Sequence, residues 1–460
     1  MLTSTQAKHN LVSRNIINIQ PFITYFTEIQ ELLLVEGTPD GELFNPGYLL
    51  PELDEKLAKY FSAAEIALSD LGNYQDVRLR FMDLRSNPAT QTTKTFASLL
   101  MVARAVRYIH DTAEKIVIVT PSSANKATAL RDAVWRAIDN GLVTSEQLRI
   151  VSVIPSESLN KTRESPLSQS AELAARNPIF TSTGENRMDV KELVRNFSST
   201  LSQNEGHEGV NFWFTLSLDN YQFADAVRAF VEQDYLPTDT ARLHAHSVSS
   251  AYGLLGHYFG YQWRVKRQKR DIQHPGYFLI QHLDTPDMVL DLYYDSFSRD
   301  NLPAYIKVDE HYRQNKSAHF PRITDDPHEV LETTFYTHQP VTSALMKSLI
   351  REHGGGGIVV SKRECSERHF LARQLLEDGS RVQLPLNFDA IRERSLSMAI
   401  TGVINAIERK IIPAGSEVLV HASGVYSEGD YIPLNEESIC IHPVKDVESF
   451  HHSIYAAAMA

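Results

Sequence analysis

The stretch that decides the fold joins an apolar strand pattern directly to a helix pattern. It begins with Lys115-Ile116-Val117-Ile118-Val119 and passes through Thr120-Pro121-Ser122-Ser123-Ala124-Asn125-Lys126-Ala127-Thr128. Residues 129–138 then follow with the pattern of a helix. A short β-branched run that leads through a small-residue loop into a helix is typical of a parallel sheet covered by helices.

The same alternation extends outward from this stretch. Further strand patterns are found at residues 149–154, 210–216, 357–361 and 418–421. Apolar residues recur at helical spacing in residues 96–108, 223–231 and 341–350. The sequence therefore predicts an α/β fold with two lobes of open parallel sheet covered by helices.

The length of 460 residues is too great for one typical core, so we expect more than one domain. Residues 1–84 contain one possible helix, at 50–68, and no recognisable chemistry. Residues 159–204 are rich in Ser, Asn, Thr and Glu and predict a loop-rich connection. The predicted parts are an N-terminal extension at 1–84, a first lobe at 85–235 and a second lobe at 236–460.

The composition excludes several classes of protein. Hydrophobic residues make up 42% and charged residues 22%, which is ordinary for a globular protein and argues against a disordered or fibrous chain. The formal net charge of -12 argues against a nucleic-acid partner. One basic run is interpreted as a solvated helix face, namely Arg264-Val265-Lys266-Arg267-Gln268-Lys269-Arg270.

Cysteine usage and apolar runs bear on the compartment. Cys365 and Cys440 are the only cysteines, too few for a disulfide framework, which fits a reducing compartment. No apolar run is long enough to cross a bilayer, and the first residues lack a signal-peptide pattern, so we expect no membrane partner. The expected location is the cytoplasm.

A lysine at a loop-to-helix junction is the first feature that carries chemistry. Lys94 lies within Asn87-Pro88-Ala89-Thr90-Gln91-Thr92-Thr93-Lys94-Thr95-Phe96-Ala97. Phe96 and Leu99 are expected to desolvate its amine in part, which lowers the pKa of the amine and favours condensation with an aldehyde. Most lysines near the start of a helix are simply solvated, so this segment alone does not establish a site.

Two loops that each follow a strand and open a helix are suited to binding anions. In residues 119–128, hydroxyl and backbone N–H groups at the helix start suit a carboxylate, and ordinary capping explains one serine but not the whole set. The second loop has small residues that let backbone N–H groups approach a phosphate. It lies within Leu243-His244-Ala245-His246-Ser247-Val248-Ser249-Ser250-Ala251-Tyr252-Gly253.

Two further features accompany these loops. His244 and His246 share one strand face, but no third metal ligand is apparent, so we interpret them as structural and predict no metal. The late strand at 418–421 is followed by Ala422-Ser423-Gly424. Because ligands in open α/β sheets bind beyond the carboxyl ends of strands, Ser423 is expected to face the same crevice.

Taken in order, the four segments resemble those of the fold-type II pyridoxal-phosphate enzymes, especially the threonine-synthase-like branch, over residues 85–434. In that family a segment of the type Asn-Pro-Thr-x-Ser-x-Lys carries the lysine that binds pyridoxal 5'-phosphate as a Schiff base, which here is Lys94. A Ser-Gly-Asn loop binds the substrate carboxylate and places its Asn beside the cofactor oxygen. Ser123-Ala124-Asn125 corresponds to that loop.

The resemblance also implies the other site residues. Ser423 takes the place of a late Ser or Thr that faces the pyridine nitrogen, and Ser122, Ser123 and Thr128 would hold the substrate carboxylate. Residues 85–235 would be the lysine-bearing and small substrate lobe, and residues 236–460 the lobe for the cofactor phosphate and ring nitrogen. The family's glycine-rich phosphate loop corresponds to Ser247, Val248, Ser249, Ser250, Ala251, Tyr252 and Gly253.

This sequence departs from the family pattern in all three motifs. Ala89 and Thr93 alter the lysine motif, and Ala124 replaces the middle glycine of the carboxylate loop. Serines and an alanine replace glycines of the phosphate loop, at Ser249, Ser250 and Ala251. The changes indicate a divergent member of the family.

The resemblance implies a pyridoxal-phosphate-dependent lyase or synthase that catalyses β- or γ-elimination or replacement on a small amino-acid substrate. Lys94 would also act as the base that removes the α-proton. In this family a neutral partner such as Ser423 goes with elimination and replacement instead of transamination. The family further implies a homodimer, while the amino acid, leaving group and nucleophile stay open.

Two alternatives remain. Because Ser249, Ser250 and Ala251 stand in the phosphate loop, the chain is alternatively a non-catalytic protein that keeps the fold as a binding or scaffold module. A nucleotide-dependent α/β enzyme ranks last, since neither Gly-x-Gly-x-x-Gly after a strand nor a Walker lysine motif occurs.

Overall fold

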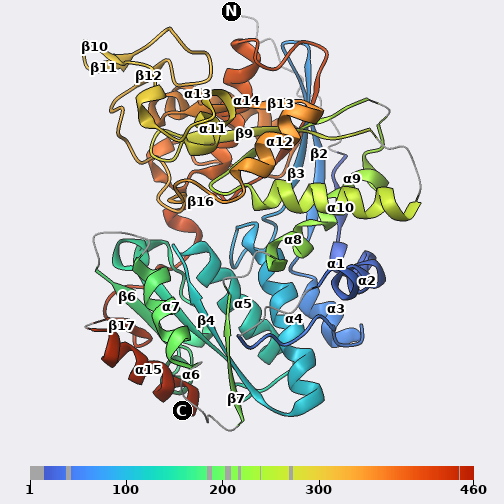
Figure 1. Cartoon of the computed structure of the whole chain (residues 1–460), viewed down its shortest axis with the longest axis vertical. Coiled ribbons are helices and arrows are strands. Elements are labelled where there is room, and N and C mark those ends of the chain that lie inside the picture. The colour runs from blue at the N-terminus through green and yellow to red at the C-terminus, as the bar shows by residue number, and fades with distance from the viewer. Residues whose placement is uncertain are drawn as a thin grey trace, which may run out of the picture.

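Two lobes, each built on its own sheet, make up the chain (Figure 1). The computed structural model describes residues 15–37, 43–183, 189–201, 209–215, 219–238, 240–268, 273–444 and 446–460. Within this part of the chain, no helix has both the length and the apolar composition that crossing a membrane requires.

The larger lobe contains a seven-stranded sheet. Its five strands from β3 onward are parallel, whereas β1, β2 and β3 pair antiparallel. In spatial order the strands are β1 (Ile17–Ile19), β2 (Ile66–Tyr74), β3 (Val77–Asp83), β15 (Glu417–His421), β8 (Leu243–Ser247), β9 (Gly276–His282) and β13 (Gly355–Val360). Gln75 and Asp76 join β2 to β3 with positive φ values of 44° and 61°, as a tight hairpin turn requires.

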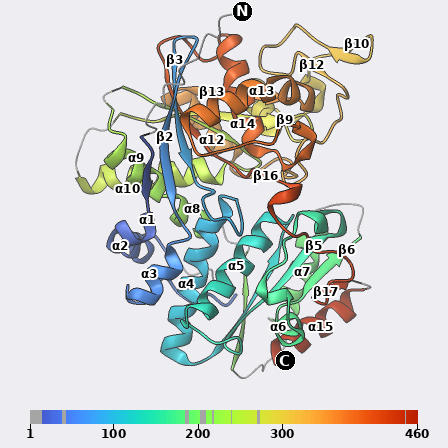
Figure 2. The ribbon, with the colours of Figure 1, turned by 180° about the vertical axis from the view of Figure 1, so that it is seen from behind.

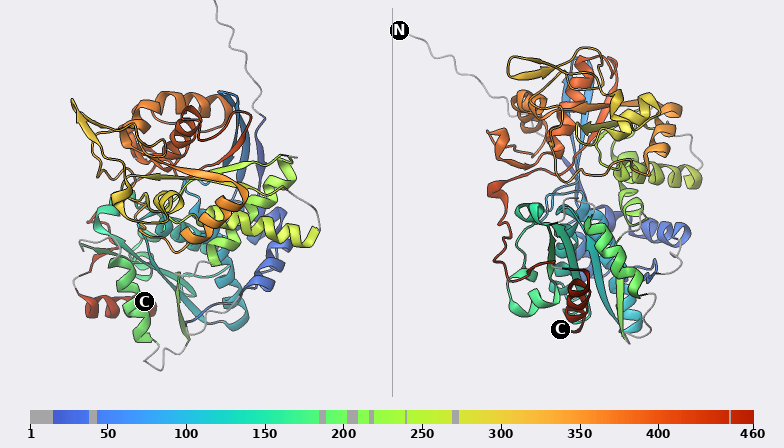
Figure 3. Two further views of the ribbon diagram at one scale, coloured as in Figure 1. Left: turned by 45° about the horizontal axis from the view of Figure 1, so that its top comes forward. Right: turned by 60° about the vertical axis from the view of Figure 1, so that its left-hand side comes forward.

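The smaller lobe contains a five-stranded, fully parallel sheet. In spatial order its strands are β17 (Ile441–Pro443), β6 (Ile179–Ser182), β5 (Leu148–Pro155), β4 (Lys115–Pro121) and β7 (Val210–Phe214). Figures 2 and 3 show that the C-terminal helix α15 (Val447–Met459) packs on this lobe. The chain therefore returns to the smaller lobe after it has completed the larger one.

Both sheets are covered by helices on two faces. In β4, Val117 and Val119 join the apolar cluster that holds α7 (Asp189–Leu201) and α15, while Ile116 and Ile118 join the opposite cluster. That opposite cluster holds α4 (Lys94–Thr112) and α5 (Asn125–Asp139). Because successive strand residues face opposite sides, a wholly apolar strand is what a sheet buried on both faces needs.

The larger sheet follows the same rule. In β9, Phe278 and Ile280 pack with α13 (Lys362–Gly379) and α14 (Ser395–Glu408), whereas Tyr277 and Leu279 pack with α11 (Asp287–Tyr294) and α12 (Ser343–His353). The other helices are α1 (Pro21–Thr24), α2 (Phe26–Glu36), α3 (Glu55–Phe61), α6 (Ala171–Arg176), α8 (Asp219–Asp225), α9 (Val227–Tyr235) and α10 (Tyr252–Gln268). Two small sheets are formed by β10 (Ile306–Val308), β11 (His311–Arg313) and β12 (Ile323–Thr324), and by β14 (Ile391–Glu393) and β16 (Tyr426–Ser427).

The predicted fold class is confirmed, and the strand patterns correspond to β4, β5, β7, β13 and β15. Residue 216 of one predicted strand lies outside the described residues. The predicted domain boundaries at 84/85 and 235/236 stay a prediction. Each of the two large sheets, however, contains strands from more than one of the predicted parts. Strands β1 to β3 of the first range belong to the seven-stranded sheet, and β17 of the last range belongs to the five-stranded sheet.

Three local predictions were wrong. The helix expected at 50–68 is reduced to α3, because Ile66 begins β2 and pairs with β1. The expected loop at 159–204 contains α6, β6 and α7, whose apolar residues pack on the small sheet. The basic run is not a solvated face throughout, since Arg264 is buried between Glu28 and Asp234; Lys269 and Arg270 lie outside the described residues.

Glycines allow α10 to approach the junction of α8 and α9 closely. A Cβ atom added to Gly260 would lie 2.2 Å from the carbonyl oxygen of Ala226, and one added to Gly256 would lie 2.4 Å from the Cβ of Asp225. The close approach fixes α8 and the start of α9, which carry Tyr221, Asp225 and Arg228.

We expect Gly260→Ala to lower the free energy of unfolding by about 1–3 kcal/mol, because the new methyl group forces backbone to move in a packed interface. Urea denaturation followed by circular dichroism measures the change. The matched control is Gly429→Ala, since nothing lies within 4 Å of its added Cβ. Equal stability of the two variants would contradict the expected clash.

Candidate functional site

One cavity of about 490 Å³ lies where the carboxyl ends of strands from both sheets meet. Lys94 reaches it from the segment after β3, Ser247 ends β8, and Ser423 follows β15. Pro121, the last residue of β4, lines it from the smaller lobe. Strand ends of parallel sheets are the usual place for ligand sites in this class of fold.

The cavity brings together the site residues predicted from the sequence, with one exception. Thr128 does not line it; its side chain is buried, and its Oγ1 has no hydrogen-bond partner among the described residues. We therefore leave Thr128 out of the candidate site. The residues that do line it are Lys94, Ser122, Ser123, Asn125, Ser247, Val248, Ser249, Ser250, Ala251, Tyr252, Gly253 and Ser423.

Lys94 is the first residue of α4 and points its amine into this cavity. The Nζ atom lies 4.8 Å from the ring centroid of Tyr221, and Tyr221 stacks on Tyr252 at the start of α10. Burial lowers the pKa of the Lys94 amine, and the carboxylate of Asp225 opposes part of that shift. A lysine with a lowered pKa supplies more of the neutral, nucleophilic amine at pH 7.

Asn125 is held by two partners that lie far away in the sequence. Its Nδ2 donates to Glu393 Oε2 at 2.9 Å, and its Oδ1 accepts from the hydroxyl of Tyr426 at 2.9 Å. Glu393 also lines the cavity and accepts a hydrogen bond from Ser395. Burial, followed by the nearby carboxylate of Glu332, raises the pKa of Glu393 to about 7.

The loop before α10 has the form of an anion site. Within the described chain, the backbone N–H groups of residues 249–253 donate to no protein acceptor. Ala251 has φ of 53°, the left-handed conformation that a glycine adopts more easily, and this turns the chain into α10. Free N–H groups and the positive end of a helix of this length together attract a phosphate.

Beside this loop, the ends of β8 and β15 carry neutral polar groups. Ser247 Oγ donates to Ser423 Oγ at 2.7 Å, and Ser423 Oγ lies 3.3 Å from His246 Nδ1. Burial, followed by the charge of Arg228, lowers the pKa of His246 to about 3, so its ring is neutral at pH 7. A heteroaromatic nitrogen that contacts Ser423 would therefore have hydroxyl groups and a neutral imidazole as its nearest hydrogen-bonding neighbours.

Sequence reasoning missed several residues that line the cavity. Glu393 and Tyr221 have no motif around them, and Arg228 is fully buried in an ion pair with Asp225 at 2.6 Å. The spacing of Asp225 and Arg228 is also that of an ordinary exposed ion pair, and the residues that bury this pair come from other parts of the chain. The sequence alone therefore does not reveal that Arg228 is buried. The packing of α8, α9 and α10 brings Tyr221 and Arg228 to the cavity, and β14 brings Glu393 to it.

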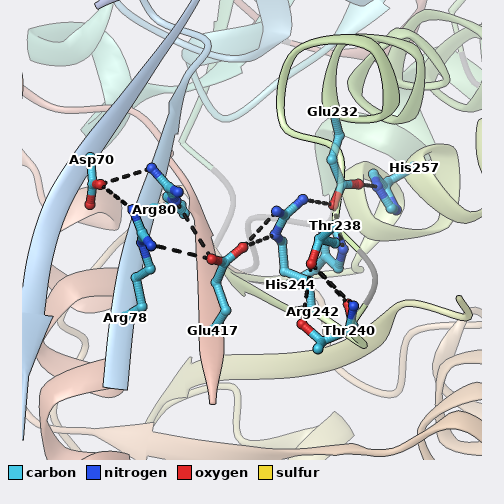
Figure 4. Close-up of polar contacts among 10 residues, drawn as sticks. All are labelled: Asp70, Arg78, Arg80, Glu232, Thr238, Thr240, Arg242, His244, His257 and Glu417. Carbon is cyan, nitrogen blue, oxygen red and sulfur yellow. Dashed lines mark hydrogen bonds and ion pairs between the residues drawn. The ribbon is translucent and has the colours of Figure 1, made fainter. Parts of the chain in front are cut away.

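A network of alternating charges crosses the larger sheet at the amino ends of β15 and β8, the ends away from the cavity (Figure 4). Arg80 contacts Asp70 at 2.8 Å and Glu417 at 3.6 Å, and Arg242 bridges Glu417 and Glu232, each at 2.5 Å. Acidic and basic groups alternate across three strands, so each buried charge has an opposite neighbour. The arrangement satisfies the requirement that buried charges be paired.

A group of histidines adjoins this charge network at Glu232. His257 Nε2 lies 2.6 Å from Glu232 Oε2, and His244 Nδ1 lies 3.0 Å from His421 Nε2. Glu232, His244 and His257 offer ligand atoms within 4.8 Å of one another, a geometry that the sequence did not reveal. The sequence showed no further ligand beside His244, whereas the structure places Glu232 and His257 there. Because Arg242 already neutralises Glu232, we interpret the group as a hydrogen-bonded network.

Comparisons with known proteins agree with this geometry at the level of the fold. The structure is similar to yeast threonine synthase, with a TM-score of 0.53 and 11% identity, over 94% of this chain and 96% of the other. It is also similar to PLP-bound threonine synthase from Brucella melitensis, with a TM-score of 0.51 and 11% identity, over 88% and 85% of the two chains. The predicted fold-type II architecture is thus confirmed.

The sequence was also compared with family models and with curated proteins. A family model described as a family of unknown function, DUF6002, matches residues 18–458. No curated protein matches the sequence.

Because several histidines are buried, we expect the free energy of unfolding to fall as the pH drops below about 6.5. Burial lowers the pKa of His244, His246 and His421 in the folded chain, so the unfolded chain binds protons that the folded chain does not. Each such proton costs about 1.4 kcal/mol of stability per pH unit, and three cost about 4 kcal/mol per pH unit. Urea denaturation between pH 7.5 and 5 measures this slope.

Replacing one histidine tests the assignment. We expect His421→Gln to reduce the slope by about one proton equivalent, whereas the exposed His452→Gln leaves it unchanged. A slope that His421→Gln leaves unchanged would show that the folded and unfolded chains protonate this ring alike.

Proposed function

We propose that this chain, which belongs to the family of unknown function DUF6002, is an enzyme that uses pyridoxal 5'-phosphate to catalyse β- or γ-elimination or replacement on an amino acid. One observation carries the proposal: Lys94, whose amine has a lowered pKa, shares a cavity with the free N–H groups at the start of α10. The former suits an aldehyde and the latter a phosphate, and pyridoxal phosphate carries both.

The residues of the cavity fit this cofactor. Backbone N–H groups of residues 249–253 supply donors that have no protein partner. A Cβ on Gly253 would lie 2.8 Å from Arg228 Nη2, so this position of the loop is closely packed against a cation. The volume of about 490 Å³ lies within the usual range of small-molecule sites, roughly 300–1,000 Å³.

Each group in the cavity has a role in the proposal. Residues 247–253 hold the phosphate, Asn125 holds the ring oxygen, and Ser423 faces the ring nitrogen. Ser122 and Ser123, at the start of α5, bind the substrate carboxylate. When bound, the cofactor supplies an electrophilic carbon and an electron sink.

Proton transfer falls to Lys94 and Glu393. Because its pKa is lowered, the Lys94 amine is able to take the α-proton at neutral pH and to hold it at Nζ. Glu393, whose pKa is about 7, exists in both protonation states near pH 7 and contacts Asn125. We assign it the proton that the leaving group needs, since its pKa is about 7 although Lys161 Nζ lies 3.8 Å from its Oε2, whereas Asp225, the other carboxylate that lines the cavity, pairs with Arg228.

The neutral groups beside Ser423 support elimination or replacement. Ser423 contacts Ser247 and His246, and neither carries a charge at pH 7. In the fold-type II enzymes a neutral partner of the ring nitrogen accompanies these reactions. We also keep the cytoplasmic location and the homodimer as parts of the proposal; the two cysteines are buried and unpaired, which supports a reducing compartment.

A non-catalytic binding module is the second candidate. It is favoured by Asn125, whose side-chain amide already has Glu393 and Tyr426 as partners. Such a protein would bind the cofactor and give no spectral response to any amino acid. Turnover of a single amino acid would reject this candidate.

We expect purified protein mixed with pyridoxal 5'-phosphate to gain a visible absorbance band, which borohydride reduction removes while it attaches the cofactor covalently to Lys94. Lys94→Ala should lose the band entirely, because no other amine takes its place, whereas the exposed Lys59→Ala should keep it. Peptide mass spectrometry locates the label. A label on Lys126 or Lys191, the other lysines of the cavity, would contradict the assignment.

We expect the absorbance of the bound cofactor, or the turnover rate, to change with a midpoint near pH 7 because Glu393 titrates there. Glu393→Gln should remove this midpoint and lower turnover by about 10²–10⁴-fold. The exposed Glu436→Gln serves as control. An unchanged midpoint in Glu393→Gln would assign the titration to another group.

A further inference from the structure

Two carboxyl groups and one ammonium group are buried together beside the cavity. Lys161 Nζ lies 2.5 Å from Glu332 Oε1 and 3.8 Å from Glu393 Oε2. All three side chains are buried, and that of Glu332 is wholly inaccessible to solvent. Glu393 lines the cavity, whereas Glu332 and Lys161 do not. This cluster therefore meets the cavity through the carboxyl group of Glu393.

The three residues come from distant parts of the chain. Lys161 ends the 3-10 helix Ser156–Lys161, which follows β5 in the smaller lobe. Glu332 lies between β12 and α12, and Glu393 is the last residue of β14. Their charges meet because the segment after β5 packs against these two parts of the larger lobe.

The cluster holds one positive charge for two carboxyl groups. The hydroxyl of Thr334 lies 2.9 Å from Glu332 Oε1 and 3.3 Å from Glu393 Oε2, so the two carboxyl groups are close neighbours. With both ionised, the cluster would carry a net negative charge away from solvent, which is costly. One proton on either carboxyl group makes the cluster neutral.

Hydrogen bonds favour the ionised form of Glu332. Its Oε1 accepts from Lys161 Nζ, and from the N–H and the hydroxyl of Thr334 at 3.0 and 2.9 Å. Its Oε2 accepts from the backbone N–H of Arg394 at 2.7 Å. A carboxylate that accepts several hydrogen bonds holds its charge to low pH. The bond to Arg394 also fixes the backbone next to Glu393.

Glu393 has fewer donors and a partner that suits its neutral form. Asn125 Nδ2 donates to Oε2 at 2.9 Å, and Oε1 contacts the hydroxyl of Ser395. A hydroxyl group donates to a carboxylate and accepts from a carboxylic acid, so Ser395 serves both states of Glu393. The hydrogen bonds therefore leave the proton of the cluster with Glu393.

The ionisation of the two carboxyl groups agrees with this assignment. Burial by itself raises the pKa of Glu332, but the charge of Lys161 and the donated hydrogen bonds outweigh burial and lower the pKa. Burial, and then the charge of Glu332, raises the pKa of Glu393 to about 7, although the charge of Lys161 acts in the opposite direction.

We propose that Glu332 and Lys161 are positioning residues: Lys161 keeps Glu332 ionised, and the charge of Glu332 keeps a proton on Glu393, at the wall of the cavity. This inference rests on the proposed function, in which Glu393 gives that proton to the leaving group. Neither positioning residue has to touch the substrate, because both act through Glu393.

The same cluster accommodates the charge that proton transfer leaves behind. The O–H bond of Glu393 breaks as the bond from the proton to the leaving atom forms, and the electron pair of the O–H bond stays on Glu393. The new carboxylate lies near Lys161 Nζ, which then faces two negative charges. Water returns a proton to Glu393 between turnovers.

Several elements contribute polar or charged groups around Glu393. The amine of Lys94 and the phenol groups of two tyrosines are also near enough for their ionisation to respond to the charge of Glu393. The full set is Lys161 after β5, Glu332 and Thr334 before α12, Asn125 on α5, Ser395 on α14, Lys94 on α4, Tyr426 on β16 and Tyr431.

The test follows the proton of Glu393 directly. Infrared difference spectra of the full chain between pH 5 and 9 detect the carbonyl stretch of a protonated carboxyl group, and the band that is missing in Glu393→Gln belongs to Glu393. We expect a midpoint near pH 7 in the wild type, both before and after pyridoxal 5'-phosphate is added. A Glu393 that stays ionised down to pH 5 would overturn the proposal.

Variants of the two positioning residues should move this midpoint in opposite directions. Glu332→Gln removes a like charge and should lower the midpoint by about one pH unit or more, whereas Lys161→Gln removes an opposite charge and should raise it by a similar amount. A merely structural role for the pair would not produce shifts of opposite sign. An unchanged midpoint in Glu332→Gln would overturn the proposal.

Further variants serve as controls. Lys161→Arg keeps the charge and should keep the midpoint near 7. The double variant Lys161→Gln with Glu332→Gln leaves neither charge unpaired, and its midpoint should lie between those of the single variants; a midpoint outside that interval would contradict the assignment. Glu367→Gln, which breaks the exposed pair of Glu367 with Arg363, should have no effect.

Turnover by the cofactor-loaded protein separates this inference from the proposed function. Because Glu393 must be protonated to donate, kcat should fall above its midpoint, at lower pH in Glu332→Gln and at higher pH in Lys161→Gln, with KM little changed. A pH profile of kcat that does not follow the infrared midpoints would overturn the positioning roles. Infrared shifts as expected in a protein that never turns over an amino acid would overturn the proposed function and leave the roles of Glu332 and Lys161 standing.

Discussion

Strand β15 lies between β3 and β8, and its hydrogen bonds to both hold the site together. The register pairs Val420 with Phe81 on one side and with Ala245 on the other, in parallel on each side. Because the three carboxyl ends then meet at one edge, the segments that follow them deliver Lys94, Ser247 and Ser423 to one cavity. A slip of β15 by one residue would turn His421 and its neighbours to the opposite faces of the sheet, so the register is as important as the pairing.

Buried charges of the larger sheet are paired with opposite charges, whereas some cations on the side of the smaller lobe are not. Toward the sheet, Glu417 and Glu232 are each neutralised by arginines, and burial lowers the pKa of the neighbouring His244 well below its usual value. Toward the smaller lobe, Lys126 and Lys191 have no acidic partner in the described chain. Paired buried charges hold elements in place, whereas an unpaired charge in a cavity favours the binding of an oppositely charged ligand.

Both loops that begin the functional helices retain an alanine in a conformation that suits glycine. Ala124 has φ of 112° and Ala251 has φ of 53°, and both side chains are buried. Such positions cost of order 1–3 kcal/mol and persist only where the surroundings dictate them. Ser122 contributes to that constraint, since its Oγ accepts hydrogen bonds from the N–H groups of Ala124 and Ala127.

The sequence by itself determined the α/β fold and the segments around Lys94, Asn125, residues 247–253 and Ser423. These could be predicted because strand patterning and a loop at a helix start are local properties, encoded within about ten consecutive residues. Only the tertiary structure decided that Thr128 lies outside the cavity, that Glu393 lies against Asn125, and that Glu232, His244 and His257 meet. Asn125 and Glu393 are 268 residues apart, and no local pattern records a contact that depends on how two sheets pack.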